Sequence, residues 1–161
     1  MILRRLEKPH RRWALCRQIA LLLAGLAILL PVAAQTNPPA DSRYLLVVET
    51  SSGMKRRSEN LQRVVGDLLF SGLNGQMNPG DTIGLWTYNE TLNAGSFPLR
   101  RWSPDRRVSL AGSVTEYLRN QKFEKPARPE VLVPQLLRLI TNSPRLTILI
   151  FTEGQVAFAG M

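Results

Sequence analysis

The sequence predicts an α/β domain with a doubly wound, mostly parallel sheet flanked by helices. Two continuous apolar runs, Tyr44 to Val48 and Leu146 to Phe151, are typical of strands buried on both faces. Helical patterns lie between the two runs, and small polar residues follow each run. In such sheets ligands bind beyond the carboxyl ends of the strands. We therefore expect Glu49 to Gly53 and Thr152 to Gly154 to lie side by side.

The segments between the two runs supply the remaining elements. Apolar residues recur at helical spacing from Leu61 to Leu69, which predicts a helix after the first strand. Thr82 to Tyr88 reads as a further strand, and Asn89 to Leu99 as its hairpin partner. Ser103 opens a second helix, and Glu130 to Ile140 forms a third that must accommodate Pro134.

The first 34 residues have the layout of a signal peptide. Six of the chain's 21 basic residues lie there, and an apolar run from Ile19 to Leu30, interrupted by Gly25, follows them. This run is shorter than the roughly 20 residues of a spanning helix, and cleavage after Ala34 fits the small residues before it. The competing interpretation is an uncleaved anchor, which would attach the chain to the membrane through residues 19–34. Both interpretations predict an exported protein, periplasmic or extracytoplasmic, held at the inner membrane if the leader is retained.

Residues 35–42 form a polar, proline-containing linker, and residues 43–161 form one domain. The only cysteine, Cys16, and the only histidine, His10, both lie in the leader. Disulfides, cysteine nucleophiles, histidine acid–base catalysis and histidine–zinc sites are thereby excluded from the domain. Because much of the basic excess belongs to the leader, the domain is only mildly basic, and we expect no nucleic-acid partner.

The run Val47-Val48-Glu49-Thr50-Ser51-Ser52-Gly53-Met54, followed by a helix, resembles the opening of von Willebrand factor A (VWA) domains. In that family the first strand ends in Asp-x-Ser-x-Ser and a later strand ends in Thr-Asp-Gly, for which this chain has Thr152-Glu153-Gly154. The resemblance implies a metal-ion-dependent adhesion site, where an acidic partner protein often supplies the last ligand to a bound magnesium. Glu49 and Glu153 take the places of the two aspartates, and Ser51 matches the first serine.

The implied metal site is degenerate. Gly53 replaces the second serine, and the stretch from Lys122 to Val131 lacks the family's threonine. Magnesium requires near-ideal octahedral geometry, so lengthened and missing ligands impair the site, whereas calcium is more permissive. We expect no cofactor and a crevice whose carboxylates are neutralised by the basic run Lys55 to Arg57. The alternative is a rearranged Mg or Ca site held by Glu49, Ser51 and Glu153.

These observations predict a protein-binding or scaffold domain of the cell envelope, not an enzyme. Its partner, another protein, would contact the rim formed by Glu49, Ser51, Ser52, Gly53 and Glu153. The alternative function is a phosphate- or nucleotide-binding α/β enzyme that uses Thr50 to Gly53 as an anion loop, although the two glutamates would repel phosphate.

Two further features leave alternatives open. The family's sheet usually carries two more strands after Thr-Asp-Gly, whereas Gln155 to Met161 are all that follow here, so either the sheet is shortened at its C-terminus or the sequence is a piece of a longer protein.

Two arginine pairs, Arg100-Arg101 and Arg106-Arg107, flank Trp102. They form either a solvated helix entry or a contact surface for an acidic partner or anionic lipid.

Overall fold

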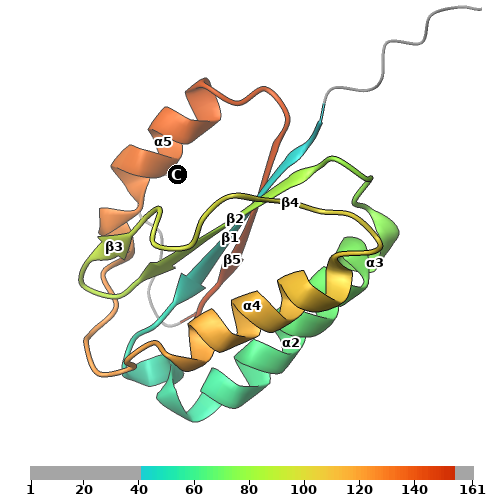
Figure 1. Cartoon of the computed structure of the whole chain (residues 1–161). Helices are drawn as coiled ribbons and strands as arrows, with labels where there is room; N and C mark the ends of the chain where they lie inside the picture. Colours follow the sequence, from blue (N-terminus) through green and yellow to red (C-terminus); the bar gives the residue numbers. More distant parts are fainter. Residues whose placement is uncertain (1–40, 155–161) are drawn as a thin grey trace, which may run out of the picture. The chain divides into compact units, whose positions relative to one another are not determined.

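The computed structural model describes residues 41–154. The predicted leader, residues 35–40 of the predicted linker and the stretch from Gln155 to Met161 lie outside the described residues. No helix among residues 41–154 is long and apolar enough to cross a membrane. The elements, in chain order (Figure 1), are β1 (Arg43–Glu49), η2 (Gly53–Arg57), α2 (Ser58–Phe70), α3 (Gly72–Gly75), β2 (Thr82–Tyr88), β3 (Leu92–Asn93), β4 (Arg100–Arg101), α4 (Arg107–Arg119), η3 (Pro129–Val131), α5 (Val133–Thr141) and β5 (Leu146–Phe151).

The sheet has the order β3-β2-β1-β5, and β4 pairs with the start of β2. β1 lies in the middle and is parallel to both β2 and β5, with Glu49 opposite Tyr88 and Val48 opposite Phe151. The short strands β3 and β4 are antiparallel to β2. The three long strands therefore end at the same edge of the sheet, which is where the sequence predicted a binding rim.

Helices cover both faces of the sheet. Alternate residues of β1 point to opposite sides. Leu46 and Val48 join a core with α2 and α4, whereas Leu45 and Val47 join a second core with Leu136 of α5. Figure 1 shows α2 and α4 together on one side of the sheet and α5 on the other. All four β1 residues are at most 3% exposed, which confirms the predicted doubly wound α/β class.

A left-handed turn connects α2 to the loop before β2. Four consecutive residues in α3 have positive φ: Gly72 at 62°, Leu73 at 54°, Asn74 at 56° and Gly75 at 80°. Such a run is costly for residues other than glycine. Packing holds it in place, because Leu73 is 4% exposed and a Cβ on Gly72 would lie 2.6 Å from the Trp102 ring. The indole Nε1 of Trp102 also donates to the Leu69 carbonyl at 3.2 Å, and this ties the segment between β4 and α4 to the end of α2.

Candidate functional site

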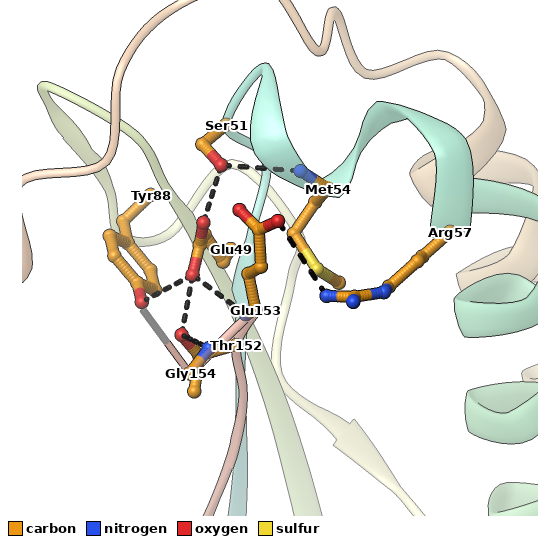
Figure 2. Close-up of polar contacts among 8 residues, drawn as sticks. All are labelled: Glu49, Ser51, Met54, Arg57, Tyr88, Thr152, Glu153 and Gly154. Carbon is orange, nitrogen blue, oxygen red and sulfur yellow. Dashed lines mark hydrogen bonds and ion pairs between the residues drawn. The ribbon is translucent and has the colours of Figure 1, made fainter. Parts of the chain in front are cut away.

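The carboxyl ends of β1 and β5 bring the two predicted acidic residues together. Glu49 is the last residue of β1, and Glu153 lies two residues after the end of the neighbouring parallel strand β5. The backbone N–H of Glu153 donates to Glu49 Oε2 at 3.1 Å, so the two residues share one rim (Figure 2). This placement follows directly from the strand order.

The Glu49 carboxylate is buried and fully engaged by groups of the protein itself. Glu49 is 3% exposed. Its Oε2 accepts from the Thr152 hydroxyl at 2.5 Å, the Tyr88 hydroxyl at 3.3 Å and the Glu153 N–H, while Oε1 accepts from the Ser51 hydroxyl. Hydrogen bonds to a charged acceptor are strong, and together they compensate for the cost of burying the charge.

Tyr88 is one of these donors because of its position in the sheet. It ends β2 directly opposite Glu49 and is 1% exposed. The pKa of Tyr88 is raised to about 12, and burial is the largest cause. The hydrogen bond with the Thr152 hydroxyl lowers this pKa, whereas the neighbouring Glu49 carboxylate raises it. At neutral pH the phenol therefore keeps its proton and donates a hydrogen bond to Glu49.

The small residues after β1 take different roles. Ser51 is 2% exposed, and while its hydroxyl donates to Glu49 it also accepts from the Met54 N–H at 3.4 Å. Ser52 is exposed, and its N–H donates to the Lys125 carbonyl at 2.8 Å. That contact joins the start of η2 to the loop after α4, where Ser51 and Lys125 form an isolated parallel bridge.

Gly53 leaves space that the Glu153 side chain fills. A Cβ on Gly53 would lie 1.8 Å from Glu153 Oε2, so a larger residue would displace the carboxylate. The other oxygen, Oε1, lies 3.7 Å from the Arg57 guanidinium at the end of η2. The Glu153 side chain is 20% exposed and that of Arg57 is 59% exposed. Glu153 is thus held against Gly53 in a partly exposed position. Figure 2 shows its carboxylate directed toward Arg57, whereas that of Glu49 is surrounded by Ser51, Tyr88 and Thr152.

The rim borders a shallow hollow of about 320 Å³. The loop after α4 supplies its opposite wall through Pro126 and Ala127. This is the stretch in which the sequence lacks the family's threonine, and neither wall residue has a side-chain oxygen. The lining residues are Glu49, Ser51, Ser52, Gly53, Pro126, Ala127 and Glu153.

The side chains at this rim do not fit the magnesium site that the VWA resemblance implies. Both oxygens of Glu49 already accept from protein donors, and Gly53 offers no hydroxyl. Glu153 occupies the space next to Gly53, and the loop contributes Pro126 and Ala127 in place of an oxygen ligand. No group of three or more acidic, histidine or cysteine side chains among residues 41–154 is arranged to hold a metal ion.

Of the donors to Glu49, Tyr88 was not predicted at the rim, and Thr152 was expected there without a role as a donor. Tyr88 could have been found by aligning the carboxyl ends of the parallel strands, since this register places it opposite Glu49. Thr152 belongs to the Thr-Glu-Gly motif, but the direction of its hydroxyl depends on the position of β5 beside β1.

Comparisons with known proteins bear on the fold. No protein-family model matches the chain, and no curated protein matches it. Among solved structures, the chain is similar to an aerotolerance-related membrane protein from Bacteroides fragilis NCTC 9343, with a TM-score of 0.51 and 15% identity over 74% of this chain and 57% of that one. The described residues have a VWA-like fold.

Two other solved structures show weaker likeness to this VWA-like chain. A von Willebrand factor type A protein from Catenulispora acidiphila has a TM-score of 0.48 and 11% identity, covering 68% of this chain and 25% of that one. The human COPII-coat protein Sec24c has a TM-score of 0.45 and 14% identity, covering 78% of this chain and 22% of that one. The VWA-like chain thus spans less than two thirds of each of the three proteins.

Proposed function

We propose that this VWA-like domain is an exported protein-binding or scaffold module of the cell envelope that contacts its partner through the strand-end rim without a metal ion. The observation that carries the proposal is the difference in environment between the two glutamates. Glu49 is buried among four protein donors and stabilises the rim, whereas the Glu153 side chain is partly exposed, at 20%. Glu153 is therefore available to a partner without the metal bridge that the family resemblance implies.

The surroundings of Glu153 suit recognition of another protein. Ser52 is exposed beside it, and the exposed run Lys55 to Arg57 follows on η2. The rim thus presents an acidic group, a hydroxyl and a basic run within a few residues, a combination that can form polar contacts with a partner surface of mixed charge.

The envelope part of the proposal rests on the leader-like sequence of residues 1–34 and on one structural neighbour. The Bacteroides protein of similar fold is described as a membrane protein related to aerotolerance. By analogy we place this chain outside the cytoplasm, periplasmic after cleavage of the leader or anchored to the inner membrane through residues 19–34 if the leader is retained.

Binding is favoured over catalysis at this rim. The described hydroxyls of Ser51 and Thr152 are both committed to Glu49, and residues 41–154 hold no histidine or cysteine. The alternative of a phosphate- or nucleotide-binding enzyme at Thr50 to Gly53 is opposed by the position of Glu153, whose carboxylate lies against Gly53. Melting temperatures measured with nucleotides or inorganic phosphate test this alternative. The test uses the Arg100→Gln/Arg106→Gln variant, which lacks two exposed arginines outside the rim that could bind phosphate by themselves. Absence of any shift in melting temperature would remove the alternative.

Site-specific photo-crosslinking in the native host tests the proposal. A photoreactive amino acid replaces exposed Ser52 at the rim, and the control replaces exposed Thr141 at the end of α5. We expect a discrete crosslinked protein at position 52 alone, unchanged in yield when divalent cations are chelated. Gly53→Ala is expected to abolish it, since a Cβ there displaces the Glu153 carboxylate while leaving the buried Glu49 in place.

Three results would reject the proposal. One is an identical crosslink at position 141, and another is a rim crosslink that persists in both Gly53→Ala and Glu153→Gln. The third is loss of the rim crosslink on chelation, because this would restore the metal-dependent mode. A folding control by circular dichroism separates loss of contact from loss of structure.

A further inference from the structure

A basic pocket lies between β4 and the first turns of α4. It has a volume of about 340 Å³. Three arginines converge on it from two elements, since Arg100 and Arg101 come from β4 and Arg106 directly precedes α4. Its full lining is Arg100, Arg101, Arg106, Ser109, Leu110 and Ser113. Because β4 pairs with the start of β2, the pocket lies toward the amino ends of the long strands, away from the rim.

The arginines near this pocket differ in how their charge is balanced. Arg101 pairs with Asp41 at 3.0 Å, and the Arg107 guanidinium lies 4.7 Å from the centre of the Phe70 ring. Arg100 and Arg106 form no ion pair with any side chain in the described part of the chain. Two exposed guanidinium groups at one pocket therefore lack an ion pair with any acidic side chain of residues 41–154.

The acid nearest in sequence does not neutralise the pocket. Asp105 is exposed and is not among the residues that line it. The pKa of Asp105 is lowered, and the largest cause is the hydrogen bond from the Ser103 hydroxyl. The charge of Arg106 also lowers this pKa, but it makes the smallest contribution. The Asp105 carboxylate is thus engaged mainly by Ser103 at the approach to α4.

The start of α4 adds to the positive potential. This helix has 13 residues, and it begins without a side-chain cap and without an acidic residue in its first turn. The positive end of the helix dipole therefore has no carboxylate within the first turn of α4 to compensate it. The hydroxyls of Ser109 and Ser113 donate to carbonyls of the helix at 2.9 and 2.8 Å, and both hydroxyls can rotate toward a ligand.

We propose that this pocket binds a phosphate group. Guanidinium groups recognise phosphate oxygens through paired hydrogen bonds, and two unpaired arginines match the charge of a phosphate better than that of a single carboxylate. Two sources can supply this group, a soluble phosphate compound or the headgroup of an anionic phospholipid. The lipid source gains support from the chain itself, because Arg101 contacts Asp41, which belongs to the polar linker between the domain and the predicted leader.

Arginine-specific modification of the full chain in neutral-detergent micelles tests the proposal. Phenylglyoxal is added in phosphate-free buffer, and mass spectrometry follows its reaction at each arginine. One arm adds inorganic phosphate, a second adds phosphatidylglycerol to the micelles, and sodium chloride at matched ionic strength controls for screening. Exposed Arg138 on α5 is the internal reference.

We expect saturable protection of Arg100 and Arg106 with no change at Arg138. Protection by inorganic phosphate identifies a soluble phosphate compound as ligand, and protection by phosphatidylglycerol without protection by inorganic phosphate identifies a lipid headgroup. The Arg100→Gln/Arg106→Gln variant should bind the protecting ligand at least about tenfold more weakly, since each hydrogen bond to a charged group contributes substantially to affinity. Arg138→Gln is the matched control and should leave binding unchanged.

The proposal fails if neither phosphate source protects the two arginines, or if Arg138 is slowed equally. It also fails if an Asp- and Glu-rich peptide protects them while both phosphate sources do not, because the pocket would then serve an acidic protein. The protection measurement uses the unmodified sequence, so it does not depend on the variants folding.

Discussion

Charged side chains at the two ends of the sheet differ in burial and in their hydrogen-bond or ion-pair partners. At the carboxyl ends of the strands, Glu49 is 3% exposed and is held by three hydroxyls and one backbone N–H. At the amino ends, Arg100 and Arg106 are exposed and form no ion pair among residues 41–154. The buried acid is closed off by the fold, whereas the arginines remain open to a ligand.

This difference separates a structural polar cluster from a recognition site. A buried charge persists only when its hydrogen bonds are satisfied, so the groups around Glu49 fix the geometry of the rim. Exposed unpaired charges stabilise the fold little and are free to meet a partner. Glu153 lies between these two cases, since its side chain is 20% exposed and pairs with Arg57 at 3.7 Å, and we propose it as the recognition group of the rim.

The largest expected effect is that of Glu49→Gln. The amide offers one oxygen acceptor in place of a charged carboxylate, and its NH₂ group faces hydroxyls or an N–H that previously donated. We expect a loss of about 3 kcal/mol in the free energy of unfolding, measured by urea denaturation. Glu153→Gln is the matched control and should cost less than about 0.5 kcal/mol, because its ion pair with Arg57 is long, at 3.7 Å, and the Arg57 side chain is 59% exposed. Equal losses in the two variants would contradict the division between buried and exposed acid.

Tyr88→Phe is expected to have a smaller effect, about 1 kcal/mol at neutral pH, from loss of the hydrogen bond to Glu49. Its pH dependence is more specific. Because the pKa of Tyr88 is raised to about 12 in the folded state from an ordinary value of 10.0, the phenol's contribution is complete below pH 10 and is lost as the pH rises toward 12. Urea denaturation between pH 9 and about 12 should show a steeper loss of stability in the wild type than in Tyr88→Phe. Parallel curves would show that Tyr88 does not titrate in this way.

The smallest expected change in stability is that of Asp41→Asn. The pair with Arg101 is exposed on both sides, with side chains 50% and 68% accessible, so the expected loss is below about 0.5 kcal/mol. The same variant frees a third guanidinium at the basic pocket and should strengthen phosphate binding there. Isothermal titration with the ligand found in the protection experiment measures this gain. Unchanged or weaker binding would show that Arg101 does not contribute to the pocket.

The sequence predicted the frame of the molecule better than the closure of its rim. Continuous apolar runs mark β1 and β5, and the parallel arrangement follows from the helices between them, so the meeting of Glu49 and Glu153 could be foreseen. The hairpin partner expected from Asn89 to Leu99 is reduced to the two-residue strand β3, and the second short strand, β4, begins just beyond the expected segment at Arg100. A long strand partner does not form there, because the segment leaves β2 after Asn93 and returns only at Arg100.

Contacts between distant segments account for what could not be foreseen. Thr152 and Tyr88 reach Glu49 across strand neighbours, and the bridge from Ser51 to Lys125 depends on how the loop after α4 folds back. The left-handed turn at α3 includes Leu73, a residue type with no preference for that conformation, and tertiary packing imposes it. Such features arise from tertiary contacts, on which local pattern carries little information.

Calorimetric titration of the full chain with magnesium and calcium chloride tests most directly whether the rim works without metal. Glu49 is saturated by protein donors and Gly53 lacks a hydroxyl, so we predict no saturable heat at concentrations up to a few millimolar for either ion. Ser51→Ala should give the same flat trace as the wild type. Tight, saturable binding that Ser51→Ala removes would contradict the account and return the rim to the metal-dependent adhesion mode.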